Sequence, residues 1–229
     1  MKRILSILLI FILFIFVSGA LCEDKIVALT FDDGPNPSFL VKALPFFQEE
    51  NIKVTFFVIG SRAKEYPQWI KRAYDEGHEI ENHSWSHICL ARPSQKSFCP
   101  EISLERALSE INRTRELIEE LTGYRTRFLR PPYLAMTEKR KREIEENIDI
   151  KVLVDSNLID SLDWAYKDPL RIKEKVIREV KNRPGNAYVI LFHEKKTTML
   201  ALPDIVKYFK EKNYKFVRID EFVKHNSKV

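Results

Sequence analysis

Cysteine is scarce in this sequence, with three residues in 229, and the three do not form a closely spaced pair. A structural zinc site made of cysteines usually contains such pairs, so the sequence disfavours this kind of site. The chain also lacks a long basic run and any interleaving of basic with aromatic residues, which argues against nucleic-acid binding. Its formal net charge is +5, or +3 without Lys2 and Arg3, a mild excess that suits an anionic surface.

No acidic residue appears before Glu23. Instead, Lys2 and Arg3 precede an apolar run from Ile4 to Val17, and small residues follow it. This is the layout of a secretory signal peptide, so we expect residues 1–20 to be removed on export and residues 21–229 to form one domain. The alternative is an uncleaved membrane anchor. We therefore expect a secreted, periplasmic or cell-wall-associated protein, with membrane contact only if this segment is retained.

Neither a linker nor an internal repeat interrupts the chain, and short apolar runs alternate with segments of helical periodicity. Strands are predicted at residues 26–29, 54–59, 79–82, 128–129, 152–154, 158–159, 187–192 and 216–217. Helices are predicted at 38–50, through Trp69 and Ala73 to Gly77, and at 103–121, 139–147, 169–181 and 198–212, with Ser38 and Ser103 as N-caps. This alternation implies a parallel sheet flanked by helices, either closed as a barrel or open and doubly wound.

Two adjacent carboxylates, Asp32 and Asp33, follow the first predicted strand, and Gly34 and Pro35 then turn the chain. Side chains alternate in direction along a strand, so these two carboxylates should point differently. One could hold a metal while its neighbour handles a proton. The alternative is a common Asp-Gly turn without chemistry.

His83 and His87 lie four residues apart, a spacing that places both imidazoles on one face of a helical turn. Three further short motifs follow an apolar stretch or end one, namely Arg130-Pro131-Pro132-Tyr133, Asp163-Trp164 and Leu191-Phe192-His193. In this order, from about Lys25 onward, the motifs resemble those of the polysaccharide deacetylases of carbohydrate esterase family 4. The resemblance implies a distorted (β/α) barrel, seven-stranded rather than eight-stranded, in a single domain.

The resemblance also implies roles for particular residues. Asp33, His83 and His87 correspond to the metal ligands of the family, with Zn²⁺ as the default ion and Co²⁺, Ni²⁺, Mn²⁺ or Fe²⁺ as alternatives. Asp32 corresponds to the general base, and His193 to the general acid that protonates the leaving amine. Without the motifs, the two neighbouring histidines could be polar loop residues and His193 a hydrogen-bonded core residue.

Other residues correspond to supporting positions of the family. Arg130 matches the residue that holds the base, with a surface salt bridge as the alternative. Asp163 matches the carboxylate that orients His193, although Asp160 is close enough in sequence to take that place. The remaining matches are substrate-binding: Tyr133 beside the oxyanion, and Trp164 and Leu191 around the acetyl methyl group. Tyr133 as a rim aromatic and Trp164 as core packing are the structural alternatives.

Several residues lie outside this pattern. Cys89 and Cys99 could close the enlarged loop from Ile88 to Glu101 as a disulfide, or remain free thiols. Glu194 stands where relatives often have aspartate, and Asn157 where an aromatic residue is expected, and both positions bear on the substrate. His78 and His225 belong to no motif and are expected at the surface.

The sequence therefore predicts a monomeric, metal-dependent hydrolase that removes N-acetyl groups from N-acetylglucosamine units of a polysaccharide. Peptidoglycan is the favoured polymer, and chitin-type oligomers come next. The alternatives are an O-acetyl esterase acting on xylan-like glycans and a catalytically dead glycan-binding module. The second alternative does not explain why both a base and an acid are present.

Overall fold

The computed structural model describes residues 24–94, 96–154, 157–183 and 185–226. The predicted signal segment at residues 1–20 and Cys22 lie outside these ranges. Among the described residues, no helix combines the length and the apolar character needed to cross a membrane.

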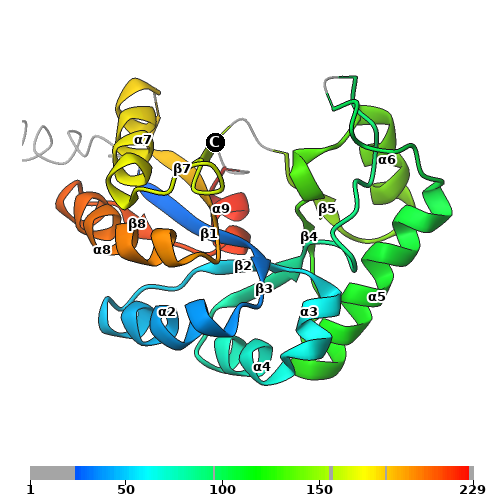
Figure 1. Cartoon of the computed structure of the whole chain (residues 1–229), viewed down its shortest axis with the longest axis horizontal. Helices are drawn as coiled ribbons and strands as arrows, with labels where there is room; N and C mark the ends of the chain where they lie inside the picture. The colour runs from blue at the N-terminus through cyan, green and yellow to red at the C-terminus, as the bar shows by residue number, and fades with distance from the viewer. Residues whose placement is uncertain (1–23, 95, 155–156, 184, 227–229) are drawn as a thin grey trace, which may run out of the picture.

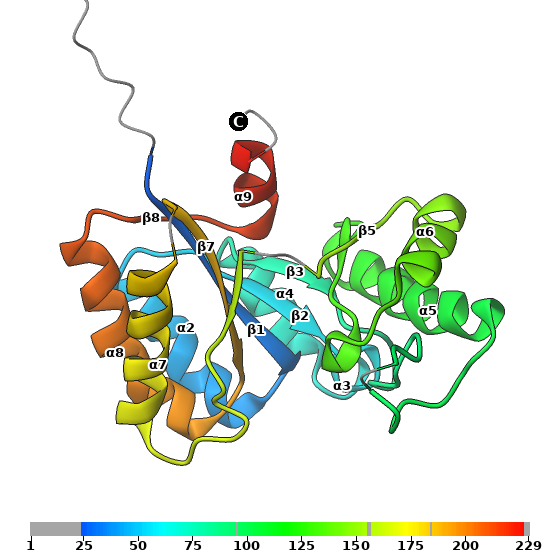
Figure 2. The same ribbon diagram turned by 90° about the horizontal axis from the view of Figure 1, so that it is seen from above.

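The described strands form one parallel sheet whose main order is β5-β4-β3-β2-β1-β7-β6 (Figures 1 and 2). A short eighth strand, β8, pairs with the start of β1 outside this order. The strands are β1 (Ile26–Gly34), β2 (Thr55–Val58), β3 (Glu79–Asn82), β4 (Phe128–Leu129), β5 (Lys151–Val152), β6 (Leu158–Asp160), β7 (Ala187–His193) and β8 (Lys215–Phe216). Because β5 and β6 are the two edges of this order, the sheet is an incomplete barrel of seven strands, which confirms the predicted fold class.

Helices follow most of the strands and, apart from α9, pack on the outside of the curved sheet (Figure 1). They are α2 (Pro37–Glu49), α3 (Gly60–Glu65), α4 (Pro67–Asp75), α5 (Leu104–Thr122), α6 (Glu138–Asn147), α7 (Pro169–Asn182), α8 (Lys196–Glu211) and α9 (Ile219–Asn226), with a short 3₁₀ turn, η1 (Pro132–Leu134). Figure 2 shows α2, α7 and α8 on one face of β1 and β7 and α9 on the other.

The alternation of β1 explains this two-faced arrangement. Val27, Leu29 and Phe31 are buried in the larger core, which also includes side chains of α2 and α8. Ile26 and Ala28 point to the opposite face, where they pack with Ile219 and Phe222 of α9 and with Phe57. Continuing the same alternation, Thr30 and Asp32 belong to this inner face. The strand thus delivers a carboxylate to the interior of the barrel.

Local signals in the sequence explain where several helices begin and end. Ser103 caps α5 by accepting a hydrogen bond from the amide of Arg106 at 3.1 Å, and Gly123 ends the helix with a φ of 72°. The predicted cap of α2 is wrong, because Asn36 rather than Ser38 is the N-cap. Its Oδ1 accepts a hydrogen bond from the amide of Ser38 at 3.1 Å.

Two other expectations from the sequence are wrong, and one helix was missed. Residues 83–87 do not form a helical turn, because the backbone at Ser84 and His87 has φ values of 63° and 58°, in the left-handed region. His78 is buried, because its Nδ1 accepts a hydrogen bond from the amide of Val54 at 3.2 Å and its ring packs against two phenylalanines. Burial lowers the pKa of His78 to about 3. Finally, the eight-residue helix α9 follows the last strand and was not predicted.

Candidate active site

A cavity of about 550 Å³ opens at the carboxyl ends of the strands, the end at which barrel proteins assemble their active sites. It brings together most of the residues that the motifs single out. Those that line it are Asp32, Asp33, His83, His87, Tyr133, Leu191, Trp164 and His193. Arg130 and Asp163 lie behind this lining, and each contacts a residue of the cavity wall. Asp32 and His193, which lie far apart in the sequence, therefore belong to one site.

Strand order places the histidines on two sides of the aspartates. β1 lies in the middle, with β2 and then β3 on one side and β7 on the other. His83 and His87 follow the end of β3, whereas His193 ends β7 and pairs in register with Asp32. The two neighbouring histidines and the single one therefore approach the aspartates from opposite directions.

Asp33, His83 and His87 form a cluster suited to a metal ion. Oδ1 of Asp33 lies 3.3 Å from Nε2 of His83 and 3.0 Å from Nε2 of His87. One potential ligand atom from each residue lies within 4.8 Å of the others. One carboxylate with two imidazoles is a common divalent-metal set that leaves positions open for water and substrate.

The hydrogen bonds of this cluster favour a cation. Nδ1 of His83 lies 2.7 Å from the carbonyl oxygen of Arg130, and a carbonyl can only accept, so Nδ1 carries the proton. A neutral His83 then turns the lone pair of Nε2 toward Asp33. Oδ1 of Asp33 is buried and accepts no hydrogen bond from the part of the chain that the structure describes. Lone pairs facing one another in this way are what a bound divalent ion would stabilise.

Positive φ explains how neighbouring aspartates reach different partners. Asp33 has a φ of 69°, which breaks the strand alternation at the end of β1. Asp33 therefore reaches the histidines while Asp32 stays on the inner face. The guanidinium of Arg62 holds the turn by donating to the main-chain oxygen of Asp33 at 2.8 Å.

Arg130 fixes Asp32 from below the cavity. Its Nη1 donates to Oδ1 of Asp32 and to Oγ1 of Thr30, each at 2.7 Å. The guanidinium also stacks over the ring of Phe57, with Cζ 4.0 Å from the ring centroid. The Arg130 side chain is only 1% exposed, so the surface salt bridge considered for it is excluded. This partner holds the Asp32 carboxylate in one orientation.

His193 is held by Asp163. Nδ1 of His193 lies 2.6 Å from Oδ1 of Asp163, and the amide of His193 donates to Oδ2 at 2.7 Å. Thr198 donates a third hydrogen bond to the same carboxylate at 2.5 Å. Burial lowers the pKa of His193, but the hydrogen bond and charge of Asp163 outweigh it, and the pKa is raised above its ordinary value. With Nδ1 engaged, Nε2 is the ring nitrogen left for the cavity.

Asp160 has different partners from Asp163. Its Oδ1 accepts from the amide of Leu162 at 2.8 Å, and its Oδ2 accepts from the indole Nε1 of Trp164 at 3.2 Å. The turn at Leu162, with a φ of 58°, separates the two aspartates and leaves Asp163 against His193.

The aromatic residues of the site are exposed. Trp164 is 58% and Tyr133 is 48% exposed, which excludes core packing for Trp164. The Tyr133 ring meets His87 edge-on, with 4.6 Å between centroids, and lies in the η1 turn with a φ of 59°. Both rings therefore present apolar surface to the cavity.

Four further residues reach the cavity without having been considered for the site, namely Lys96, Phe98, Leu134 and Lys195. The first two lie in the loop whose enlargement was visible in the sequence, but its position over the site was not. Thr198, the additional partner of Asp163, carried no recognisable signal, because it is one of several polar residues near the start of α8.

Fold and site together define a class of α/β-barrel protein in which side chains from the ends of several strands converge on one cavity. The family model described as polysaccharide deacetylase matches residues 22–153, more than half of the chain. The chain belongs to this family. It is 35% identical over 200 residues to the peptidoglycan-N-acetylmuramic acid deacetylase PdaC of Bacillus subtilis (strain 168). That alignment covers 87% of this chain and 39% of PdaC.

A second relative is the peptidoglycan-N-acetylglucosamine deacetylase PgdA of Listeria monocytogenes serotype 1/2a (strain 10403S). It is 32% identical over 198 residues, covering 86% of this chain and 39% of PgdA. The chain thus spans about two fifths of the length of each of these curated relatives. Among solved structures, that of peptidoglycan deacetylase PdaC from Bacillus subtilis superposes with a TM-score of 0.75 at 31% identity. The superposition covers 90% of this chain and 93% of the PdaC chain in that structure.

Proposed function

We propose that this protein hydrolyses the acetamido group of N-acetylated sugars in a polysaccharide, and that peptidoglycan is its polymer. One observation carries the proposal. Asp32 and His193, a carboxylate and an imidazole in register on adjacent strands, stand beside the cluster of Asp33, His83 and His87 in one cavity. A glycan-binding module has no need for this combination.

Amide hydrolysis needs an activated water, a stabilised oxyanion and a proton for the leaving amine. A divalent ion held by Asp33, His83 and His87 would polarise the acetyl carbonyl and lower the pKa of a bound water. Asp32 accepts a proton from the attacking water at a carboxylate oxygen, while Arg130 keeps that carboxylate oriented. Zn²⁺ is the ion that we favour for this donor set.

His193 completes the reaction from the other side. Its Nε2 delivers a proton to the departing sugar nitrogen, and Asp163 keeps the ring protonated until that step. The η1 turn offers the backbone amide near Tyr133 to the oxyanion. Trp164 and Leu191 line the cavity with apolar surface that suits the acetyl methyl group.

The choice of polymer rests on relatives. PdaC is named for N-acetylmuramic acid and PgdA for N-acetylglucosamine, and both sugars occur in peptidoglycan. A formal charge of +5, or +3 without Lys2 and Arg3, suits an anionic wall polymer. Chitin-type oligomers come second. We also propose that residues 1–20 direct export, with membrane attachment if they are retained, and that the protein acts as a monomer.

Acetate release tests the proposal. The purified protein is offered N-acetylated glycans and O-acetylated xylan, each with and without a chelator and after divalent metal is added back. We expect release from N-acetylated glycans that the chelator stops and the metal restores. Acetate release from xylan alone would favour the alternative that the protein is an O-acetyl esterase. Glycan binding without any acetate release would favour a binding module and overturn the proposal.

A further inference from the structure

The loop from Cys89 to Cys99 forms one side of the cavity. Its ends are joined by a disulfide, and both cysteines are buried against Ala135, which follows the η1 turn. Two residues near the second cysteine, Lys96 and Phe98, line the cavity. Phe98 is 65% exposed, an unusual position for a large apolar side chain. A disulfide therefore holds an aromatic residue and a cation at the rim of the site.

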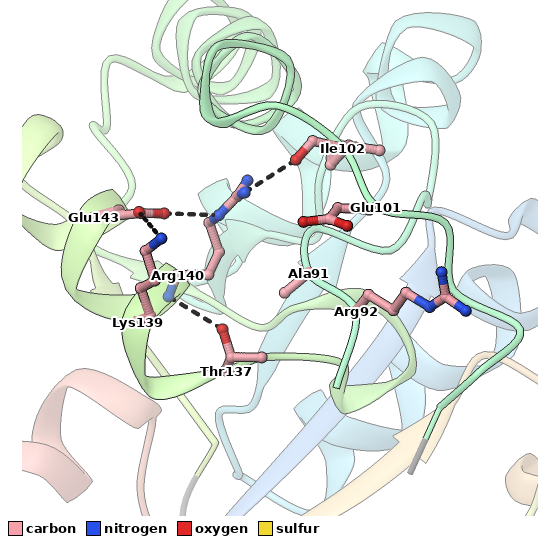
Figure 3. Close-up of a pocket in the computed structure, with 8 residues that line it drawn as sticks. All are labelled: Ala91, Arg92, Glu101, Ile102, Thr137, Lys139, Arg140 and Glu143. Atoms are coloured by element: carbon pink, nitrogen blue, oxygen red, sulfur yellow. Dashed lines mark hydrogen bonds and ion pairs between the residues drawn. The ribbon is translucent and has the colours of Figure 1, made fainter. Parts of the chain in front are cut away.

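Arg140 of α6 fixes the base of this loop. It donates to the carbonyl of Leu90 at 3.4 Å and to those of Ile102 and Ser103 at 3.0 and 3.2 Å, so it binds both ends of the loop. Figure 3 shows Arg140 between Ile102 and Glu143, in a small cavity of about 190 Å³. Since Glu143 also pairs with Arg140 at 3.0 Å, the charged groups there serve to anchor the loop.

The tip of the loop touches the catalytic turn. The ammonium group of Lys96 donates a hydrogen bond to the main-chain oxygen of Tyr133. The Phe98 ring meets the Tyr133 ring edge-on, with 5.5 Å between centroids. Tyr133 in turn contacts His87. The loop is therefore braced against the reacting centre.

Lys96 and Lys195 give the rim of the cavity an excess of positive charge. The carboxylates there are engaged: Asp32 with Arg130, Asp33 with the two histidines, and Asp160 with an amide and an indole. Lys96 lines one wall, and Lys195, next to Glu194 at the start of α8, lines the other. Within the described ranges, neither lysine forms an ion pair. Two lysines that lack a carboxylate partner there thus line the space that a glycan would enter, and Lys96 uses one of its N–H groups on the main-chain oxygen of Tyr133.

We propose that the rim of this cavity selects acidic glycans: Phe98 stacks on a sugar ring, and Lys96 and Lys195 bind a carboxylate of the same strand. The inference rests on the proposed function and adds the chemical class of the substrate. In peptidoglycan such a carboxylate has two sources, the lactyl ether of a muramic acid unit and the stem peptide. A charged hydrogen bond is worth more than a neutral one, so each lysine should change affinity measurably.

The test compares three substrates: neutral N-acetylglucosamine oligomers, glycan strands whose stem peptides have been removed to free the lactyl carboxylate, and strands that keep their peptides. A fourth, the stripped strand with its carboxylates amidated, is the matched neutral control. Acetate release gives kcat and KM for the wild type and for Lys96→Gln, Lys195→Gln and the double variant. Lys71→Gln, on the exposed face of α4, is the control variant.

We expect the double variant to lower the ratio of kcat/KM for acidic to neutral strands about tenfold or more, mainly through KM. Lys71→Gln should keep the ratio, and Phe98→Ala should raise KM for all strands. Loss on stripped strands identifies the lactyl group, and loss only on peptide-bearing strands identifies the peptide. An unchanged ratio overturns the inference while the proposed function stands.

A wild type that releases no acetate overturns the proposed function instead. In that case calorimetric binding of the stripped and amidated strands still decides the inference. Equal affinity of the wild type for the two strands would refute the role of the lysines.

Discussion

The carboxylate of Glu194 occupies the space beside Gly34 in which any other residue would place a side chain. A Cβ on Gly34 would lie 1.9 Å from Oε1 of Glu194, closer than two non-bonded atoms can approach. Oε2 accepts a hydrogen bond from the amide of Asn36 at 2.5 Å, and the side-chain amide of Asn36 donates to the main-chain oxygen of Glu194 at 2.9 Å. These contacts hold the turn after Asp32 and Asp33 against Glu194, the residue that follows His193.

Gly34→Ala should disrupt the contact between this turn and Glu194. The added methyl group must displace the Glu194 carboxylate, an overpacking that we expect to lower the free energy of unfolding by about 1–3 kcal/mol. Acetate release should fall with it, because Asp33 and His193 are both next to the contact. Urea unfolding of Gly34→Ala, Glu194→Asp and the double variant measures the effect. If the shorter aspartate did not restore part of the stability lost in Gly34→Ala, direct overlap of these two residues would be the wrong cause.

Glu194 should also make stability depend on pH. Burial raises its pKa from 4.5 to about 8, against the opposing effect of the Asn36 hydrogen bond. Above pH 4.5 the unfolded chain releases this proton while the folded protein retains it, so this contribution to stability declines as pH rises toward 8. Glu194→Gln should therefore be less sensitive to pH over that window. The check is the unfolding midpoint of both proteins from pH 5 to pH 8.5, and parallel curves would contradict it.

Asp163→Asn should move the alkaline limb of the pH profile of kcat to lower pH. The proposed acid, His193, must be protonated to act, so we expect activity to decline as pH rises through its pKa. Removing the Asp163 charge removes the main cause that raises this pKa and leaves the opposing effect of burial. Asp160→Asn is the matched control, since Asp160 contacts Trp164 rather than His193. If the alkaline limb moved equally in Asp163→Asn and Asp160→Asn, Asp163 would not be the residue that raises the pKa of His193.

Metal content should separate the two adjacent aspartates. Asp32→Asn removes the proposed base but keeps the cluster of Asp33, His83 and His87, so we expect bound metal and a loss of turnover of about 10²–10⁴-fold. His83→Ala should lose both metal and turnover, whereas His225→Ala on α9 should lose neither. Elemental analysis alongside acetate release gives both readouts. Retention of most activity in Asp32→Asn would show that another group takes the proton.

Much of this arrangement was predictable because local signals agreed with the tertiary structure. The apolar runs at 26–29 and 187–192 became β1 and β7, and Ser103 and Gly123 bound α5 as expected. The motif residues share a cavity because they follow the carboxyl ends of parallel strands. These features depend on short stretches of sequence and on one topological rule.

What escaped prediction depends on contacts between distant segments. Ser38 was the predicted cap of α2, but Asn36 caps it, and contacts with the distant Glu194 hold Asn36 in place. His78 is buried because two phenylalanines and the amide of Val54 surround it, which its own neighbours in sequence do not indicate. Asp163 rather than Asp160 meets His193 because of a left-handed turn at Leu162. α9 has too few residues for its periodicity to be recognised, and it gains its packing on the inner face.

The position of α9 in the sequence, after all the motif residues, bears on when the site can be completed during synthesis. Its first two amides, those of Ile219 and Asp220, bind Thr55 at 3.0 Å and Glu79 at 3.2 Å, and Ile219 and Phe222 share a small internal space with Arg130. Every motif residue precedes this helix in the chain, so a ribosome finishes the motifs before the support beneath Arg130 exists. A nascent chain halted before Ile219 should therefore carry the full set of reacting groups over an open interior and be inert. Activity then begins only when the last stretch docks.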